Sequence, residues 1–225
     1  MELIFLPLDV FERHKIASEG IRPGEIVLDV GGGVNALARF VKNKIVVSNL
    51  YGRADVLADG RNLPFGSNSF DVVTSIDVIE HLSKKDRRRF IKELLRVSRR
   101  AVIFSSPLGT TGHREKEKEV YNFLLKRGIK SKFLSEHLKK GLPSAGELAG
   151  CLAKVKFKVI YSGNYRLSAF LTKLDALELK DPKFNKLFYW FKKLINVGLI
   201  LFYFPFSKSG KEKEFTNRIY FFVEK

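Results

Sequence analysis

The segment VLDVGGG at residues 27–33 constrains this chain more than any other. A short apolar run that ends in consecutive glycines is typical of a buried strand followed by a tight turn, because glycine accepts backbone conformations that other residues avoid. In open α/β sheets such a turn borders a crevice at the carboxyl ends of the strands, where ligands bind. The segment therefore predicts a ligand-binding loop after the first strand of an α/β fold.

Further apolar runs alternate with helical patterns through the first half of the chain. Asp9 is expected to cap the first helix, and Ser83 with Asp86 matches a capping box at the start of a long helix. Continuous apolar strands between helices favour a doubly wound parallel sheet covered on both faces. The expected strands are 25–30, 44–48, 54–58, 70–76 and 101–105, and the expected helices are 10–19, 36–42 and the one that follows Ser83.

The second half of the chain is more helical and more aromatic. We expect one domain over 1–225, in which 1–107 form the ligand-binding half and 108–225 a substrate-side half. Within the second half, the expected helices are 113–140, 145–154 and a helical insert at 167–206, and the expected strands are 157–162 and 217–223.

The chain is strongly basic, with a net charge of +17. Residues 1–110 hold 17 basic and 13 acidic side chains, and residues 111–225 hold 24 and 11, so most of the excess lies in the second half. A basic field attracts nucleic acid, an anionic membrane or a phosphorylated substrate. The lack of Gln and the abundance of Lys also suit a thermophilic source, in which the charge is a heat-adapted surface.

Cysteine usage and apolar run lengths suggest a cytoplasmic protein. Cys151 is the single cysteine, so the sequence predicts neither a disulfide framework nor a cysteine-built metal site. Neither HExxH nor CxxC occurs, and no metal is expected. The start of the chain lacks the basic region of a signal peptide. The longest apolar run, 197–206, is shorter than the roughly 20 residues of a membrane span.

Two ligands compete for the glycine loop. Gly31, Gly33 and Ala36 fit the G-x-G-x-x-G/A pattern of dinucleotide sites, which is a weak signal on its own. Asp29 lies two residues before the first glycine, where a carboxylate would repel a pyrophosphate and would suit a ligand with a cationic amino-acid group. A tight turn without any ligand is the remaining alternative.

The sequence around this loop resembles the class I S-adenosylmethionine-dependent methyltransferases. VLDVGGGVN at 27–35 is similar to the family's first motif. ADGRNLPF at 58–65 is similar to its D-x-x-x-L-P-F segment, FDVVTSIDVIEHL at 70–82 to its fourth-strand motif, and 96–107 to its fifth strand. The resemblance implies a seven-stranded, mostly parallel Rossmann-like sheet, in which the last strand is antiparallel, and S-adenosylmethionine as cofactor.

The resemblance also assigns roles to individual residues. Asn49 stands where the family usually has an acid, so ribose binding should be weaker or differently made. Asn35 replaces a common third glycine, and the turn should survive because Asn tolerates left-handed backbone. The implied cofactor contacts are Asp29 and Gly31, Gly32 and Gly33 for the methionine part, Asn49 for the ribose, Asp59 with Gly60 for the adenine, and Asp77 at the end of the fourth strand.

Methyl transfer often needs a base, and three histidines are the candidates. His81 follows the fourth-strand motif, and a purely structural role at a helix start is equally consistent with its position. His113 follows the loop after the fifth strand, where substrates bind in this architecture. His137 lies in a segment similar to a substrate-side loop of small-molecule and sugar-modifying family members. His14 is expected to be an ordinary helix residue.

The aromatic segment at 184–206 allows three interpretations. It could be a helix packed on the sheet, a lid over an apolar substrate, or an interfacial helix on an anionic membrane, since aromatic residues and lysines together suit that boundary. The third interpretation would make the protein peripheral to a membrane.

These features together favour S-adenosylmethionine-dependent methyl transfer to a small molecule, a sugar or a lipid-linked glycan. An RNA methyltransferase is the alternative within the class; the N-P-P-[YF] tetrad of base N-methylation is replaced here by DVIE at 77–80. From other classes, an NAD-dependent oxidoreductase and a non-catalytic binding module that keeps the fold remain open.

Overall fold

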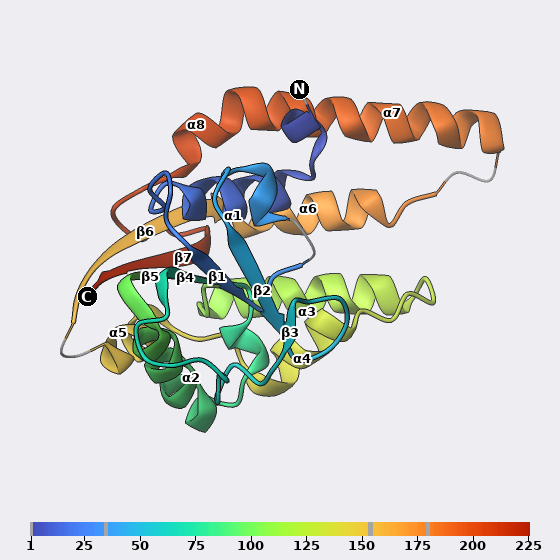
Figure 1. Cartoon of the computed structure of the whole chain (residues 1–225). Helices are drawn as coiled ribbons and strands as arrows, with labels where there is room; N and C mark the ends of the chain where they lie inside the picture. Colours follow the sequence, from blue (N-terminus) through green and yellow to red (C-terminus); the bar gives the residue numbers. More distant parts are fainter. Residues whose placement is uncertain (1, 34–35, 153–154, 179–180) are drawn as a thin grey trace.

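The computed structural model describes residues 2–33, 36–152, 155–178 and 181–225. Its centre is a seven-stranded sheet with the order β3-β2-β1-β4-β5-β7-β6 (Figure 1). The neighbouring strands β1 to β5 pair in parallel, and β7 is antiparallel to both β5 and β6. This arrangement confirms the predicted fold class. The strands are β1 (Val27–Val30), β2 (Ile45–Asn49), β3 (Val56–Leu57), β4 (Phe70–Ile76), β5 (Ser98–Pro107), β6 (Lys156–Asn164) and β7 (Thr216–Glu224).

Helices cover both faces of the sheet, with α2 and α5 on one face and α1 on the other (Figure 1). The α-helices are α1 (Leu8–Ser18), α2 (Lys84–Val97), α3 (Thr111–Leu125), α4 (Lys132–Lys140), α5 (Ala145–Cys151), α6 (Tyr165–Asp175), α7 (Pro182–Gly198) and α8 (Phe204–Ser207). Short 3₁₀ turns occupy Glu2–Phe5, Leu37–Arg39 and Ile79–His81, and a π-helical segment, Leu199–Tyr203, joins α7 to α8.

The largest apolar core cluster lies between the sheet and α2. All four residues of β1 are buried, as a strand covered on both faces requires. The apolar side chains of α2 recur at the spacing of one helical face, so Phe90, Ile91 and Leu94 all lie against the sheet. From the second half of the chain, β7 contributes Phe221, whose ring stacks on Phe104 with the centroids 4.9 Å apart. The two halves of the chain therefore share one core.

Several predicted helix boundaries are wrong in detail. The residue before α1 is Pro7, so Asp9 lies in the first helical turn and does not cap it. The Ser83 hydroxyl donates to the Asp86 carboxylate at 2.6 Å and makes no capping bond to the backbone. The expected helix at 36–42 is only the 3₁₀ turn Leu37–Arg39. Asn35 and the end of the helix expected at 145–154 lie outside the described residues.

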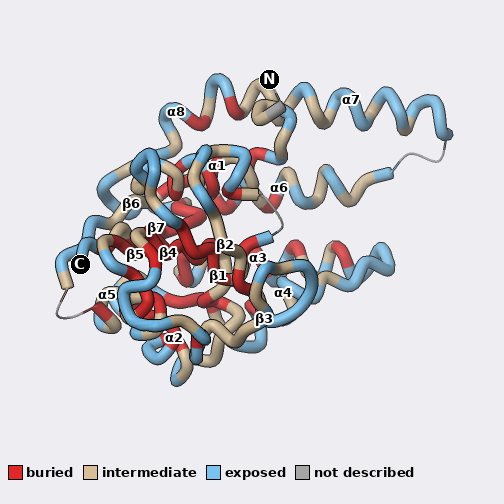
Figure 2. Tube along the Cα trace, in the orientation of Figure 1, coloured by how far each residue is buried: buried red, intermediate tan, exposed pale blue. Residues whose placement is uncertain are grey.

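The segment α7–α8 forms one long rod, Pro182–Ser207, that extends past the body of the domain (Figures 1 and 2). Its 26 residues reach a mean hydropathy of 1.4 over the most apolar window, and 11% of that window is buried. By length and composition alone, the rod could cross a membrane. The apolar stretch of this helix is therefore longer than the run 197–206, because two lysines interrupt it without ending the helix.

Candidate functional site

A cavity of about 520 Å³ opens at the carboxyl ends of the parallel strands. This volume falls within the roughly 300–1,000 Å³ of small-molecule sites. The glycine loop after β1 and the loop after β4 form part of its lining, and residues of α1, α3, α4, α6 and β7 form the remainder. The cavity therefore lies where the topology of a parallel sheet predicts a ligand.

The glycine loop is shaped around the carboxylate of Asp29. Gly31 has a φ of +79°, which side-chain-bearing residues rarely adopt. A Cβ at Gly32 would lie 2.0 Å from Asp29 Oδ2, so this position also requires glycine. Asp29 is 2% exposed, and its Oδ1 accepts a hydrogen bond of 2.9 Å from the Thr74 hydroxyl. Burial raises the pKa of Asp29 to about 6.

These residues fit the amino-acid end of S-adenosylmethionine. Among the described residues, Thr74 is the one hydrogen-bond donor to this buried carboxylate, which would gain from a cationic partner. Within the described part of the chain, a Cβ built at Gly33 would meet nothing within 4 Å. Ligand atoms therefore have room beside the loop backbone.

The residues predicted for the ribose and adenine lie near the loop but do not line the cavity within the described part of the chain. The Asn49 amide donates to the Gly32 carbonyl at 3.5 Å. The Asp59 carboxylate is held by Arg61, at 2.7 Å from Nη2, and this pairing lowers the pKa of Asp59. Gly60 lies against Phe90, whose ring would be 2.4 Å from a Cβ at that position. Gly60 thus borders the core cluster between the sheet and α2, whereas Asn49 contacts the glycine loop.

Asp77 lines the cavity, but its carboxylate is already paired. It has a left-handed backbone conformation, with φ of 58°. Arg13 of α1 donates to Oδ2 at 2.8 Å, and Arg218 of β7 donates to Oδ1. Neither arginine was predicted to belong to the site. Arg218 is 6% exposed. The sequence feature that could have identified it is its position as the one charged residue in the apolar strand NRIYFFV.

His113 lies in the first turn of α3, just after the loop that follows β5. Its Nδ1 donates to the Leu108 carbonyl at 2.8 Å, which leaves Nε2 as the unprotonated nitrogen of the neutral ring. The ring stacks on Tyr165, with the centroids 5.1 Å apart. Burial lowers the pKa of His113, so the neutral form is favoured at pH 7.

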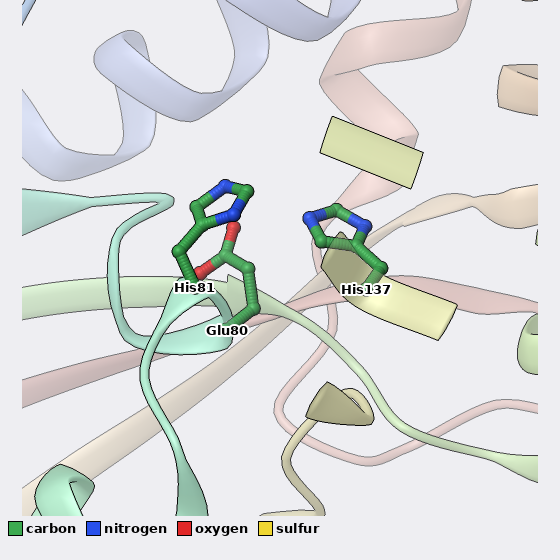
Figure 3. A group of neighbouring side chains, drawn as sticks. All are labelled: Glu80, His81 and His137. Atoms are coloured by element: carbon green, nitrogen blue, oxygen red, sulfur yellow. The ribbon is translucent and has the colours of Figure 1, made fainter. Parts of the chain in front are cut away.

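The fold brings His81 and His137 together from distant parts of the chain (Figure 3). Their ring centroids are 4.9 Å apart. His81 Nδ1 lies 2.8 Å from Glu136, and His137 Nδ1 lies 2.8 Å from Glu117. Each imidazole is thus oriented by its own carboxylate. All three histidines proposed from the sequence line the same cavity.

Glu80 completes this group and was not predicted as a site residue. It is 1% exposed, and burial raises its pKa to about 8. Among the described residues, Glu80 Oε2 and His137 Nε2 are buried atoms without a hydrogen-bond partner. The sequence feature that could have identified Glu80 is its position next to His81, at the end of the fourth-strand motif. The contribution of α4, more than 50 residues later, could not be inferred from local spacing.

Comparisons with known proteins identify a methyltransferase domain in this chain. Residues 28–105 match the model of a methyltransferase domain family. Over 202 residues the chain is 26% identical to the probable tRNA methyltransferase 9B of Mus musculus, covering 76% of this chain and 45% of that protein. It is also 26% identical to the ubiquinone/menaquinone biosynthesis C-methyltransferase of Idiomarina loihiensis, covering 53% of this chain and 58% of that protein. The matches thus span less than two thirds of these relatives.

The fold has solved counterparts. A possible histamine N-methyltransferase from Thermotoga maritima superposes with a TM-score of 0.57 at 16% identity, covering all of this chain and 92% of that one. The domain match identifies residues 28–105 as a methyltransferase domain, and the sheet order with this likeness shows the fold of the class I S-adenosylmethionine-dependent methyltransferases. The cofactor of this family is S-adenosylmethionine, as the first sequence motif implied.

Proposed function

We propose that this chain transfers a methyl group from S-adenosylmethionine to a small-molecule acceptor, a class that includes sugars and lipid-linked glycans. One observation carries the proposal: a single cavity of about 520 Å³ connects the glycine loop to the three histidines. The methionine end of the cofactor and the acceptor would therefore meet in one cavity. Enclosure and alignment supply much of the rate in a two-reactant transfer.

The cofactor end rests on Asp29 and the glycine loop. Asp29 would face the ammonium of the methionine part, and the backbone of Gly31–Gly33 would hold its carboxylate. Asn49 would bind the ribose, and Asp59 with Gly60 the adenine. When bound, S-adenosylmethionine supplies an electrophilic methyl group on a sulfonium.

At the acceptor end, His113 is suited to take up a proton. Its neutral form and fixed tautomer would allow it to act as a general base within the cavity. The acceptor atom would lose its proton to His113 and form a bond to the methyl carbon. The carbon–sulfur bond breaks at the same time, and its electron pair stays on sulfur.

The acceptor class can be tested with methyl-labelled S-adenosylmethionine. Purified protein is incubated with separate small-molecule, lipid and RNA fractions of a cell extract, and labelled products are identified by mass spectrometry. The proposal expects label in the small-molecule or lipid fraction. Label confined to the RNA fraction would replace the proposed acceptor class.

An RNA acceptor is the second candidate. It is favoured by the charge of the second half, 24 basic against 11 acidic residues, and by the similarity to a probable tRNA methyltransferase. Binding that rests on phosphate contacts must weaken log-linearly with salt. Gel shifts with transfer RNA at two salt concentrations, with duplex DNA for comparison, test this candidate. Tight binding that is selective for transfer RNA would promote it.

Cofactor affinity should depend on the ionisation of Asp29. Its folded pKa of about 6 lies above the ordinary 3.8, so the carboxylate protonates as pH falls through 6. An ammonium ligand needs the charged form. The affinity for S-adenosylhomocysteine should therefore be constant above pH 7 and fall about tenfold per pH unit below 6.

The raised pKa of Asp29 also affects the stability of the ligand-free protein, in the opposite direction. Cofactor affinity should fall as pH is lowered, whereas stability should rise. A raised carboxyl pKa favours the protonated folded state, so this group should make the protein more stable as pH falls from 6 towards 4. Calorimetric titrations between pH 5 and 8 measure the affinity. In Asp29→Asn the affinity should be weak and independent of pH. A wild-type affinity that is flat across this range would contradict the assigned role of Asp29.

A further inference from the structure

We propose that Glu80, His81 and His137 form a binding site for one divalent transition-metal ion. The metal site itself rests on the geometry of these side chains. Its use in catalysis rests on the proposed function.

The first support is the convergence of ligand atoms. One ligand atom from each of the three residues lies within 4.8 Å of the other two (Figure 3). Ligands on opposite sides of a metal are about 4 Å apart when each bond is roughly 2.0–2.2 Å. The three side chains therefore need only small rotations to share one ion.

The second support is the pair of buried atoms without partners. Glu80 Oε2 and His137 Nε2 are both shielded from water and make no hydrogen bond within the described structure. Leaving such an atom unsatisfied destabilises the folded protein, because the atom has lost its contact with water and gained no partner. Glu80 is 1% exposed and His137 is 9% exposed, so solvent gives little compensation. A metal ion would satisfy both atoms at once.

The third support is the orientation of the two imidazoles. Glu136 holds Nδ1 of His81 and Glu117 holds Nδ1 of His137, each at 2.8 Å. A carboxylate on the far nitrogen is the usual outer-shell partner of a metal-binding histidine, because it fixes the tautomer and leaves the other nitrogen free to bind. Both histidines of the cluster share this feature.

The ligand set indicates the class of ion and of acceptor. Two imidazoles with one carboxylate suit Zn²⁺, Mn²⁺, Fe²⁺ or Co²⁺ better than Mg²⁺ or Ca²⁺, which prefer oxygen ligands. Three protein ligands leave a coordination position towards the cavity. A hydroxyl bound there would have a lowered pKa and become a better nucleophile. The site thus favours an acceptor that is methylated on oxygen.

Metal binding can be measured without any acceptor. Wild-type protein is stripped with a chelator and titrated with Zn²⁺, Mn²⁺ and Co²⁺ by calorimetry, with Mg²⁺ as the hard-ion comparison. We expect one ion per chain. Glu117→Gln removes an outer-shell partner and should weaken metal binding by roughly 10–100-fold. Glu80→Gln and His137→Asn each remove a ligand and should weaken it by at least as much.

Glu119→Gln is the matched control, because this exposed carboxylate pairs with Lys116 and Lys173 away from the cluster. It should bind metal like the wild type. Circular dichroism and S-adenosylhomocysteine affinity, measured on every variant, separate loss of the metal site from loss of the fold or of the cofactor site. Wild-type protein that binds none of these ions, or Glu80 and His137 variants that bind them normally, would overturn the metal site and leave the proposed function standing.

A second observation, independent of the first, concerns the exposed side of the rod Pro182–Ser207. We propose that this side binds the surface of an anionic lipid bilayer. Large apolar residues recur at helical spacing along it and are between 51% and 69% exposed. This outward stripe consists of Phe184, Leu187, Phe191, Leu194 and Leu201.

The attachment of the rod to the domain suits binding to a membrane surface rather than a span. At its carboxyl end, Ile200 and Phe204 are buried in a cluster with Leu8, Ile16 and Tyr220, which holds the rod on the domain. A spanning helix would have to leave this cluster.

Basic and aromatic groups lie together along the rod. Lys193 Nζ is 5.0 Å from the centroid of the Tyr189 ring and 5.7 Å from that of Trp190. Lys183 and Lys186 are exposed. Aromatic rings and lysines beside an apolar stripe match the boundary of an anionic bilayer.

Vesicle sedimentation tests this surface. The full chain should bind vesicles of phosphatidylcholine with phosphatidylserine, and high salt should release it. Replacing both Leu187 and Leu194 by Ser should weaken binding about tenfold or more, because the bilayer then buries less apolar area. Leu125→Ser changes an exposed leucine of α3 outside the rod and should leave vesicle binding unchanged. Absence of sedimentation, or a stable dimer that buries the stripe in the absence of vesicles, would overturn the proposal.

Discussion

Replacing Gly32 by Ala should weaken S-adenosylmethionine binding about 10- to 100-fold. The added methyl group would lie 2.0 Å from Asp29 Oδ2. Asp29 cannot move away easily, because it belongs to a fully buried strand and is bonded to Thr74. Relieving the clash must displace either the carboxylate or the loop, at a strain of roughly 1–3 kcal/mol. Equilibrium dialysis with labelled cofactor measures the loss.

Gly150→Ala is the control for this change. Among the described residues, nothing lies within 4 Å of a Cβ built at Gly150, which belongs to α5 and does not line the cavity. Its affinity should equal that of the wild type. A Gly32→Ala protein that melts normally and binds the cofactor with unchanged affinity would show that the loop does not hold it.

Replacing Phe90 by Ala should produce the largest loss of stability, about 3–5 kcal/mol. Phe90 is 1% exposed and lies between α2 and the sheet, against Gly60. Truncation leaves a cavity that this core cannot fill. For a chain of this size each kcal/mol lowers the melting temperature by roughly 2–4 °C, so thermal unfolding should shift by about 6–20 °C.

Phe202→Ala provides the comparison on the rod. Phe202 is 77% exposed, and its loss should change the free energy of unfolding by less than about 0.5 kcal/mol. Equal destabilisation by the two substitutions would mean that the rod is part of the hydrophobic core in solution. It would also argue against a free apolar stripe.

The sheet was predictable because its strands carry strong local signals. β4 matches the expected range 70–76, since Phe70–Ile76 is rich in aromatic and β-branched residues and follows the turn-rich segment 66–69. Helix starts were less predictable. Pro7 is as suitable for a helix start as Asp9 is for a cap. The Ser83 hydroxyl can bond either to the helix backbone or to Asp86. Such choices depend on tertiary neighbours that the sequence does not reveal.

The candidate site was predictable only where it follows a strand. Asp29 and the glycines form one contiguous motif, and the three histidines each follow a recognisable element. The partners of these residues come from elsewhere in the chain. Arg218 reaches Asp77 because β7 lies beside β5, and Glu117 reaches His137 because α3 and α4 pack together. Long-range pairing of this kind leaves no local pattern.

The most direct test of the central claim is calorimetric titration with S-adenosylmethionine, S-adenosylhomocysteine and NAD. The structure places a buried carboxylate, Asp29, beside the glycine loop, where it favours an ammonium and opposes a pyrophosphate. We expect both sulfur ligands to bind with one site per chain, and NAD to give no heat of binding. Binding of NAD without binding of either sulfur ligand would contradict the assignment of this chain as an S-adenosylmethionine-dependent methyltransferase.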